Sequence, residues 1–303
     1  MNNETHTAQF DEETFDGYPN TWVMIMTSTE LATNSVKPFE MCGQQLVAFR
    51  GASGAVHVLS AYCPHLGANL GIGGHVVSES GDDCIQCPFH GWRFGGRDGQ
   101  CKRIPNIETS EMNKLNASVK HWETIEMNMM IFVWYHKDDA QPDHYPHDFM
   151  ADCNQKLIVM ENAVDEEHLI TVHANIMLGV ASTFEKQTPA KVAGAKSITG
   201  AWLIKFTCYS PLYCINYINS VSTVCVTAGT PLRPNKTTLN VLYFAPPGLF
   251  YRLIAELATF SFKLEIEKDD KIWEALRRPK RPIFTSNDEL IIKLKYTISD
   301  QIN

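Results

Sequence analysis

Short runs of β-branched and aromatic residues, separated by polar turns, fill the chain from about residue 20 to 135. Runs of this length and composition are typical of strands rather than helices. Glycine-rich segments at 51–54 and 95–99 supply turns between them. The pattern therefore predicts an all-β domain with strands at Trp22–Met26, Gln45–Phe49, Val56–Ser60, Ile85–Cys87, Ser118–Trp122 and Met130–Tyr135.

The second half of the chain mixes helical and strand-like patterns. Polar, proline-containing Lys137–His147 predicts a linker, so we expect domains at 18–136 and 148–303. An α+β fold is predicted for the second domain, with an antiparallel sheet and covering helices. Its expected helices are Glu161–His173, Leu249–Phe262, Leu264–Leu276 and Asn287–Ile298, and its expected strands are Trp202–Tyr209, Tyr213–Thr227 and Thr237–Phe244.

Two short motifs in the first domain each combine one cysteine with one histidine. Cys63 precedes His65 by two positions, and Cys87 precedes His90 by three. This donor set suits a Rieske [2Fe–2S] cluster, in which the cysteines hold one iron and the histidines the other. Zinc sites usually group like ligands as C-x2–4-C and H-x3–5-H, whereas each half here mixes the two types. The motifs therefore predict an electron-carrying iron–sulfur cluster.

The segment between the two motifs needs its own interpretation. Cys84 and Cys87 form a C-x-x-C pair that could indicate a redox dithiol or half a zinc site, but we interpret Cys84 as a small buried residue. The polar run Ser78–Asp83 predicts an exposed hairpin loop, which tolerates the extra length between the motifs.

Composition narrows the class of protein. The 303 residues are 44% apolar and 20% charged, which suits a globular protein of two domains. The net charge of −8 argues against a general nucleic-acid binder. The cysteine count of nine is odd, and four or more of these cysteines lie in apolar or motif contexts, which favours a reducing compartment. We expect a cytoplasmic protein without a spanning helix, although Leu249–Ala255 could form an amphipathic patch at a membrane surface.

A second candidate metal site lies in the predicted helix at 161–173. Asn162, Asp165 and His168 are three residues apart and share one helix face, and His173 follows near the end of the helix. Two histidines and one carboxylate are the ligand set of non-haem Fe(II) oxygenases. A third ligand to His168 and His173 must come from elsewhere, and the acidic run at 265–270 offers four carboxylates.

The two metal motifs together resemble the oxygenase component of Rieske non-haem iron oxygenases. The chain is most similar to the Neverland-type cholesterol 7-desaturases and next to the 3-ketosteroid 9α-hydroxylase oxygenases. The segments that carry the resemblance are YCPHLGANL at 62–70, CIQCPFHGW at 84–92, FVWYH at 132–136 and EHLITVH at 167–173. The family's C-terminal acidic motif matches residues 267–273, which implies Asp269 as the third iron ligand and Asp270 as the fallback.

The resemblance also implies an assembly and an activity. It implies a head-to-tail homotrimer, in which Asp165 connects His168 to His90 of the partner subunit and Asn162 lies near the iron. Electrons from NAD(P)H, delivered by a separate reductase or ferredoxin, would serve O2-dependent hydroxylation or desaturation of an apolar sterol or steroid. The open alternatives are a Rieske oxygenase with a non-steroidal substrate and a non-enzymatic Rieske electron carrier.

Overall fold

The computed structural model describes residues 17–149, 196–199, 202–210, 212–218, 223–233, 236–245 and 247–275. The chain divides into two compact units. The β unit comprises Asn20–Cys153 together with Ala228–Leu239, and the mixed unit comprises Met1–Pro19, Asn154–Thr227 and Asn240–Asn303. The expected domain limits of 18–136 and 148–303 stay a prediction, but the grouping of residues 228–239 with the first half of the chain was not expected.

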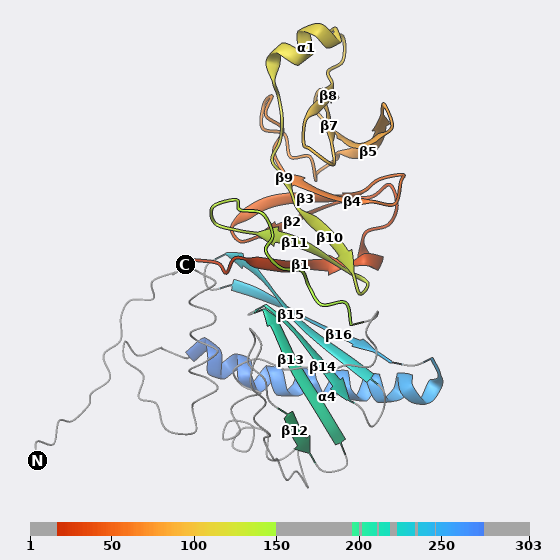
Figure 1. The fold of residues 1–303 in the computed structure, drawn as a ribbon, viewed down its shortest axis with the longest axis vertical. Coiled ribbons are helices and arrows are strands. Elements are labelled where there is room, and N and C mark those ends of the chain that lie inside the picture. Colours follow the sequence, from red (N-terminus) through yellow and green to blue (C-terminus); the bar gives the residue numbers. More distant parts are fainter. Residues whose placement is uncertain are drawn as a thin grey trace, which may run out of the picture. The chain divides into compact units, whose positions relative to one another are not determined.

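Three antiparallel sheets build the β unit (Figure 1). Short connections join the strands, with a 3-10 turn η1 (Ser28–Glu30) and one short helix α1 (Thr109–Leu115). The first sheet has the order β1 (Thr21–Thr27), β11 (Met130–Tyr135), β10 (Thr124–Met127); the second β2 (Val36–Met41), β3 (Gln44–Arg50), β4 (Val56–Ser60), β9 (His121–Trp122); and the third β5 (His75–Glu79), β6 (Asp82–Gln86), β7 (Arg93–Gly95), β8 (Cys101–Arg103).

The central strand β11 explains why its sequence is apolar without alternation. Five successive residues, Met130–Trp134, are buried, so both faces of this strand are covered. The neighbouring strand β1 is buried over Thr21–Met24 in the same way. Continuous apolar runs in the sequence therefore correspond to strands covered on both faces.

The predicted all-β character of this half is confirmed, with one correction in detail. The expected strand Ser118–Trp122 pairs as a strand only at His121–Trp122, while Ser118 forms an isolated bridge with Gln100. The hairpin expected at Ser78–Asp83 is confirmed, and it joins β5 to β6 by a tight turn. Its turn is formed by Ser80 and Gly81 at φ values of 53° and 85°. Positive φ at both turn residues gives the turn a twist that matches the right-handed twist of the flanking strands.

The expected linker Lys137–His147 packs against the β unit along part of its length. The indole N–H groups of Trp22 and Trp134 donate hydrogen bonds of 2.7 Å to the carbonyls of His144 and Ala140. Tyr145 stacks on Trp22 at a centroid distance of 5.8 Å. The role of Lys137–His147 as a linker stays a prediction, and the contacts with Trp22, more than 120 positions away, could not be anticipated from composition.

Residues 228–239 are fixed to the β unit by hydrogen bonds. The Thr230 hydroxyl donates to the Met24 carbonyl at 2.5 Å, and Thr230 is buried. The backbone N–H groups of Cys42 and Gly43 donate to the carbonyls of Pro231 and Leu232. These contacts explain why a short stretch from late in the chain groups with the β unit.

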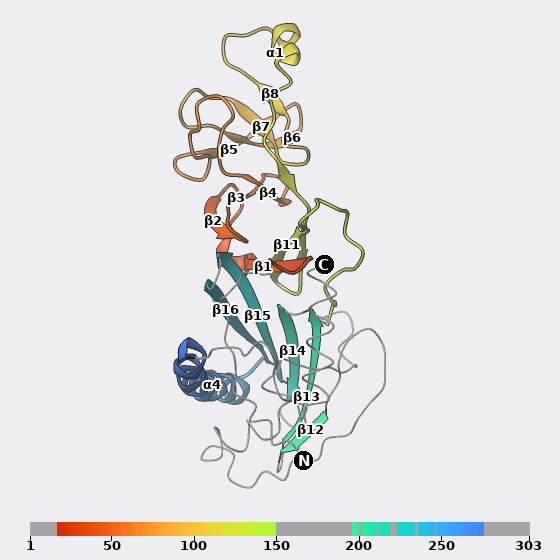
Figure 2. The same cartoon turned by 90° about the vertical axis from the view of Figure 1, so that its left-hand side faces the viewer.

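The mixed unit contains a long helix and most of a five-stranded sheet in meander order, whose residues 228–239 belong to the β unit (Figure 2). The expected run Tyr213–Thr227 is two strands, and the two helices expected at 249–276 are one continuous helix, because no glycine or proline interrupts the helical pattern there. Helices expected at 161–173 and 287–298 lie outside the described residues. The elements are β12 (Lys196–Thr199), β13 (Trp202–Ser210), β14 (Tyr213–Ile218), β15 (Thr223–Arg233), β16 (Lys236–Phe244) and α4 (Leu249–Ala275).

The predicted fold class, a β domain followed by an α+β domain, is confirmed. Within the described ranges, no helix combines the length and the apolar composition needed to cross a bilayer.

Candidate iron–sulfur centre

Two loops of the β unit carry the Cys/His motifs, and both fold in the same way. The Cys63 carbonyl accepts a hydrogen bond from the Gly67 N–H, and the Cys63 N–H donates to Ala68, each at 2.9 Å. In the second loop, the Cys87 carbonyl accepts from Gly91 at 3.1 Å, and its N–H donates to Trp92 at 2.8 Å. The partners lie four and five residues beyond the cysteine in both loops, so the two halves are structurally equivalent.

A left-handed glycine closes each loop. Gly67 and Gly91 have φ values of 74° and 71°, which are strained for any residue with a Cβ atom. At Gly91 a Cβ would also lie 3.1 Å from Pro105, whereas at Gly67 it would meet nothing within 4 Å. The glycine beyond each histidine is therefore required by backbone conformation at both loops and by close packing only at the second.

The loops bring like side chains together although the sequence interleaves them. Cys63 and Cys87 are each 2% exposed, and their thiols lie within hydrogen-bonding reach of one another. His65 and His90 are exposed, with ring centroids 4.7 Å apart. A Rieske cluster requires this arrangement, with a thiolate pair at one iron and an imidazole pair at the other. The four side chains fit that cluster.

The surroundings of the cysteine pair are apolar. Cys63 and Cys87 belong to a core cluster of buried residues with Phe49, Leu59, Leu70, Ile85 and Phe94. Burial is the main cause that raises the pKa of the Cys63 thiol to about 11, and the neighbouring Cys87 adds to the effect. Because iron binds thiolates, loading of this site has to release protons.

Aromatic rings hold the histidine pair at the surface. Trp92 stacks on His65 at a centroid distance of 4.7 Å and an interplanar angle of 8°. Phe89 lies 4.2 Å from the His90 ring and is itself exposed, as is Leu66 beside His65. The histidine end of the site is therefore open to solvent and has an apolar rim.

Buried Cys84 fits its interpretation as a small core residue. It is 0% exposed in β6, and burial raises its pKa to about 11. Across the described stretches, no three His, Cys, Asp or Glu side chains surround a single metal position. Cys63, Cys87, His65 and His90 instead form two pairs.

The other predicted iron ligands are only partly covered by the structure. His168, His173, Asp165 and Asn162 lie outside the described residues. Asp269 lies near the end of α4 and is 5% exposed, whereas Glu267 on the same helix is exposed. The side chain of Asp270 lies outside the described part of the chain.

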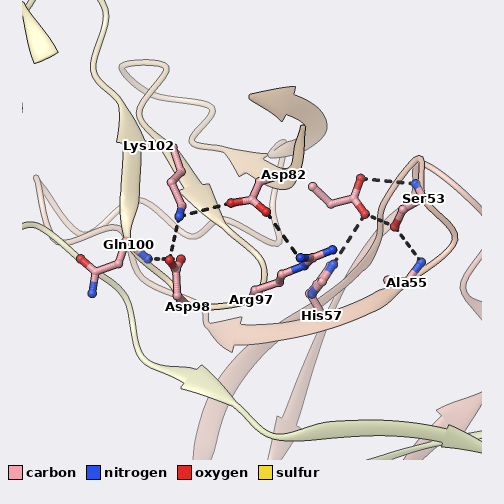
Figure 3. A network of polar contacts seen from close by, with 9 residues as sticks. Ser53, Ala55, His57, Asp82, Arg97, Asp98, Gln100 and Lys102 are labelled. Carbon is pink, nitrogen blue, oxygen red and sulfur yellow. Dashed lines mark hydrogen bonds and ion pairs between the residues drawn. The ribbon is translucent and has the colours of Figure 1, made fainter. Parts of the chain in front are cut away.

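A polar network that the sequence did not reveal supports the strand leading to Cys87. Asp83 on β6 accepts hydrogen bonds from the hydroxyl and the backbone N–H of Ser53, and it lies 3.7 Å from the Nε2 atom of His57 (Figure 3). The Asp83 side chain is only 9% exposed, whereas Ser78, Ser80 and Gly81 of the same hairpin are exposed as expected. The physical reason is that the turn at Ser53, distant in sequence, covers the Asp83 side chain.

Two glycines make room for this network. A Cβ at Gly51 would lie 2.0 Å from an Asp83 carboxylate oxygen, and a Cβ at Gly96 would lie 2.3 Å from the His57 ring. Both glycines were interpreted as turn formers from the sequence. Their position beside buried side chains shows that space, and not only turn geometry, demands glycine there.

A second part of the network lies nearer the surface. Lys102 contacts the carboxylates of Asp98 at 2.7 Å and Asp82 at 3.3 Å, and Arg97 contacts Asp82 at 3.9 Å (Figure 3). Partly exposed pairs of this kind contribute little stability each. They connect the β5–β6 hairpin to β8 and the turn before it.

The buried part of the network has defined protonation states. Burial lowers the pKa of His57, and the opposing effect of Asp83 offsets this only in part. Burial acts to raise the pKa of Asp83, but the hydrogen bonds from Ser53 and the proximity of His57 outweigh it, so this pKa is lowered. At neutral pH the network therefore pairs a neutral imidazole with a charged carboxylate.

Comparisons with known proteins agree with this geometry. The sequence pattern of the Rieske [2Fe-2S] domain family matches residues 21–123. Cholesterol 7-desaturase nvd of Xenopus laevis is 37% identical over 191 residues, which cover 56% of this chain and 39% of that protein. The Caenorhabditis elegans cholesterol 7-desaturase is 44% identical over 126 residues, covering 42% of this chain and 28% of that protein. The chain thus spans well under half the length of these relatives.

One relative is matched over nearly the whole chain. The oxygenase component of 3-ketosteroid-9-alpha-monooxygenase from Rhodococcus rhodochrous is 24% identical, with 90% of this chain and 81% of that protein covered. Among solved structures, dicamba monooxygenase bound to dicamba has a TM-score of 0.70 at 17% identity, covering 96% of this chain and 98% of the other. The quaternary ammonium Rieske monooxygenase CntA has a TM-score of 0.58 at 18% identity, covering 82% and 76%.

The β unit therefore contains a Rieske [2Fe-2S] domain, and the chain has the fold of the Rieske oxygenases. Within that class, cholesterol 7-desaturases and a steroid monooxygenase component are among its curated relatives, which confirms the resemblance that the motifs indicated.

Replacing Trp92 with leucine is expected to raise the midpoint potential of the cluster by tens of millivolts. Loss of the stacked ring exposes the covered face of the His65 imidazole to water, which stabilises the extra negative charge of the reduced state. Protein-film voltammetry measures the shift. Trp92→Phe is the control, because it retains a stacked ring and should keep the potential. Equal potentials in Trp92→Leu and the unmodified protein would show that stacking does not tune the site.

Acidification from pH 7 to pH 5 is expected to destabilise the protein partly through His57. Its folded-state pKa is lowered, so the unfolded chain binds more protons as the pH falls below the ordinary value of about 6.5. Asp83, also with a lowered pKa, loses its contribution only in more acidic solution. Urea unfolding of His57→Gln should show a smaller change in free energy over this window. The exposed His75→Gln serves as the control, and equal pH slopes for both variants would contradict the assignment.

Proposed function

We propose that this chain is an oxygenase component that uses O2 and reductase-supplied electrons to hydroxylate or desaturate an apolar sterol or steroid. The observation that carries the proposal is the pairing of buried Cys63 and Cys87 beneath exposed His65 and His90, in a chain whose relatives include cholesterol 7-desaturases and a steroid monooxygenase component.

The cluster site would serve as a relay for single electrons. Cys63 and Cys87 would hold the inner iron, and His65 and His90 the outer one; a bound cluster supplies one-electron transfer at a potential raised by the neutral imidazoles. Exposure of the histidines lets a redox partner approach closely, and the apolar rim at Leu66 and Phe89 suits a transient protein contact. We include the NAD(P)H-dependent reductase or ferredoxin in the proposal as that partner.

We assign the mononuclear iron to His168, His173 and Asp269. Burial of Asp269 supports this assignment, because a buried carboxylate is costly unless nearby positive charge or hydrogen bonds compensate it. A ferrous ion held by two imidazoles and one carboxylate leaves positions open for O2. The chemistry supplied by the iron would be the removal of hydrogen from an unactivated C–H bond. Asp270 remains the alternative third ligand.

The assembly is part of the proposal. A head-to-tail homotrimer would place the histidine end of one subunit near the iron of the next, with Asp165 joining His168 to His90 of the partner subunit and Asn162 close to the iron. Such an interface is heterologous and closes into a ring. The exposure of His65 and His90 supports an intersubunit contact.

Iron content is the sharpest test of the mononuclear site. The protein should hold about three iron atoms per chain, two in the cluster and one in the triad. His168→Ala and Asp269→Ala should each hold about two and lose O2-dependent turnover, while cluster absorbance and electron paramagnetic resonance signals persist. Asp270→Ala is the matched control and should retain all three.

A His168→Ala protein that keeps its full iron content and its turnover would remove the triad assignment. Two iron atoms per chain in the unmodified protein would favour the electron-carrier interpretation.

Substrate class is tested by turnover with a surrogate reductase. Cholesterol, a 3-ketosteroid and a planar aromatic acid are supplied in separate reactions, and products are identified by mass spectrometry. We expect oxygen-dependent conversion of a sterol or steroid, since the relatives named for their substrates act on these compounds. Conversion of the aromatic acid alone would reject the steroid assignment while preserving the oxygenase.

A further inference from the structure

Helix α4 carries an exposed apolar stripe along one face. The stripe residues are between 38% and 66% exposed and follow one another at intervals of three and four positions, which is the a/d pattern of a heptad repeat. A helix whose outer face meets only water normally carries polar residues there. The residues of this stripe, which we call the α4 seam, are Phe250, Leu253, Leu257, Phe260 and Leu264.

The seam lies beside the face that α4 turns toward its own sheet, and Phe250 of the seam contacts Tyr251 of that face at a ring-centroid distance of 5.4 Å. Tyr251, Ile254 and Ala258 are half-buried, and the Tyr243 hydroxyl on β16 donates a hydrogen bond of 3.4 Å to the Ala258 carbonyl. At about 100° per residue, the seam is centred about 110° from this inner face. Figure 2 shows α4 on one side of the sheet. The helix therefore has two apolar faces, of which the sheet covers one.

The form of the seam favours a helix as its partner over a lipid surface. Its width is about 80° at 100° per residue, which matches a coiled-coil seam and is narrower than the apolar face of a globular helix. The charged side chains next to it form the ion pairs Arg252–Glu256 and Lys263–Glu267, at 2.8 and 3.9 Å. Their charges cancel, so they supply no attraction to an anionic bilayer.

The seam is complementary to a second copy of itself in antiparallel orientation. With the two-fold axis between residues 258 and 259, Leu253 faces Leu264 of the partner subunit, and Leu257 faces Phe260 of the partner subunit. The same register sets Glu256 beside Lys263 of the partner subunit, twice by symmetry. In a parallel pair, Glu256 and Lys263 of the partner subunit would lie on opposite sides of the seam. Four of the five seam residues thus form apolar layers in the register that the flanking charges favour, while Phe250 at the end of the seam faces Glu267 of the partner subunit.

We propose that the α4 seam is a homodimerisation surface in which the α4 helices of two copies pack antiparallel. The interface is isologous, since the same patch is used by both copies. It does not depend on the proposed oxygenase function. It is compatible with a head-to-tail ring, because two rings joined through this surface give an assembly with an even number of chains.

The test measures assembly mass by analytical ultracentrifugation over a wide range of protein concentration. The unmodified chain should form assemblies with an even number of copies. Leu257→Glu should lose the doubled mass, because it places two carboxylates in the apolar seam. Thr259→Glu is the control: Thr259 is exposed on α4 outside the seam, so this variant should retain the unmodified mass.

A charge-exchange series tests the register without touching the apolar layers. Glu256→Lys and Lys263→Glu should each weaken association about tenfold, because each replaces two attractive contacts with two repulsive ones. The double variant E256K/K263E should restore it. Within one helix, the double variant still has two repulsive pairs, Lys at 256 with Arg252 and Glu at 263 with Glu267. Restored association can therefore come only from contacts between copies.

Several outcomes would overturn the proposal. One is an odd-numbered or monomeric assembly at every concentration. Another is a double variant as weak as the single ones. Co-sedimentation of a monomeric protein with phosphatidylcholine vesicles, lost in Leu257→Glu, would assign the seam to a lipid surface. A monomeric protein whose thermal stability falls in Leu257→Glu would show that the seam is covered within its own chain.

Discussion

The central constraint of the β unit is that two thiols must lie side by side in an apolar core while two imidazoles lie side by side at the surface. The sequence orders these groups as Cys63, His65, Cys87 and His90, so the pairing can arise only when two loops meet. Each loop holds its cysteine by two backbone hydrogen bonds at the same spacing. Each loop is therefore held by its own hydrogen bonds, and the strands that flank the loops set how they face each other.

That sheet depends on contacts from distant parts of the chain. β6, the strand that leads directly to Cys87, also carries buried Asp83, which joins the Ser53 turn and His57. A charged carboxylate in this position is costly unless it is hydrogen-bonded, and the network supplies those bonds. Gly51 and Gly96 leave the space that the buried side chains fill. The loop that carries Cys87 and His90 thus follows a strand that Asp83 connects to the Ser53 turn and to His57.

Local patterns in the sequence predicted the parts of the site that are held by adjacent residues. The spacing of Cys63 to His65 and of Cys87 to His90 confines each donor pair to one loop. The spacing alone was therefore enough to predict the cluster. The β11 strand was equally clear, because five successive buried residues leave an unbroken apolar run. Asp83 was misassigned because its burial depends on a turn thirty positions away, and polar neighbours on its own hairpin indicated solvent. Packing between distant segments leaves no mark in local composition.

Helix α4 shows a related limit of sequence patterns. Its residues were divided into two helices at 262–264, yet the helix is continuous, because an unbroken helical pattern without glycine or proline gives no reason to stop. The apolar residues of α4 also form two faces instead of one. Tyr251, Ile254 and Ala258 face the sheet, while Leu253 and Leu257 lie on the seam. A helix with two apolar faces needs two partners to bury them. The sheet of its own unit is one, and the symmetric complementarity of the seam identifies the second as another copy of the chain.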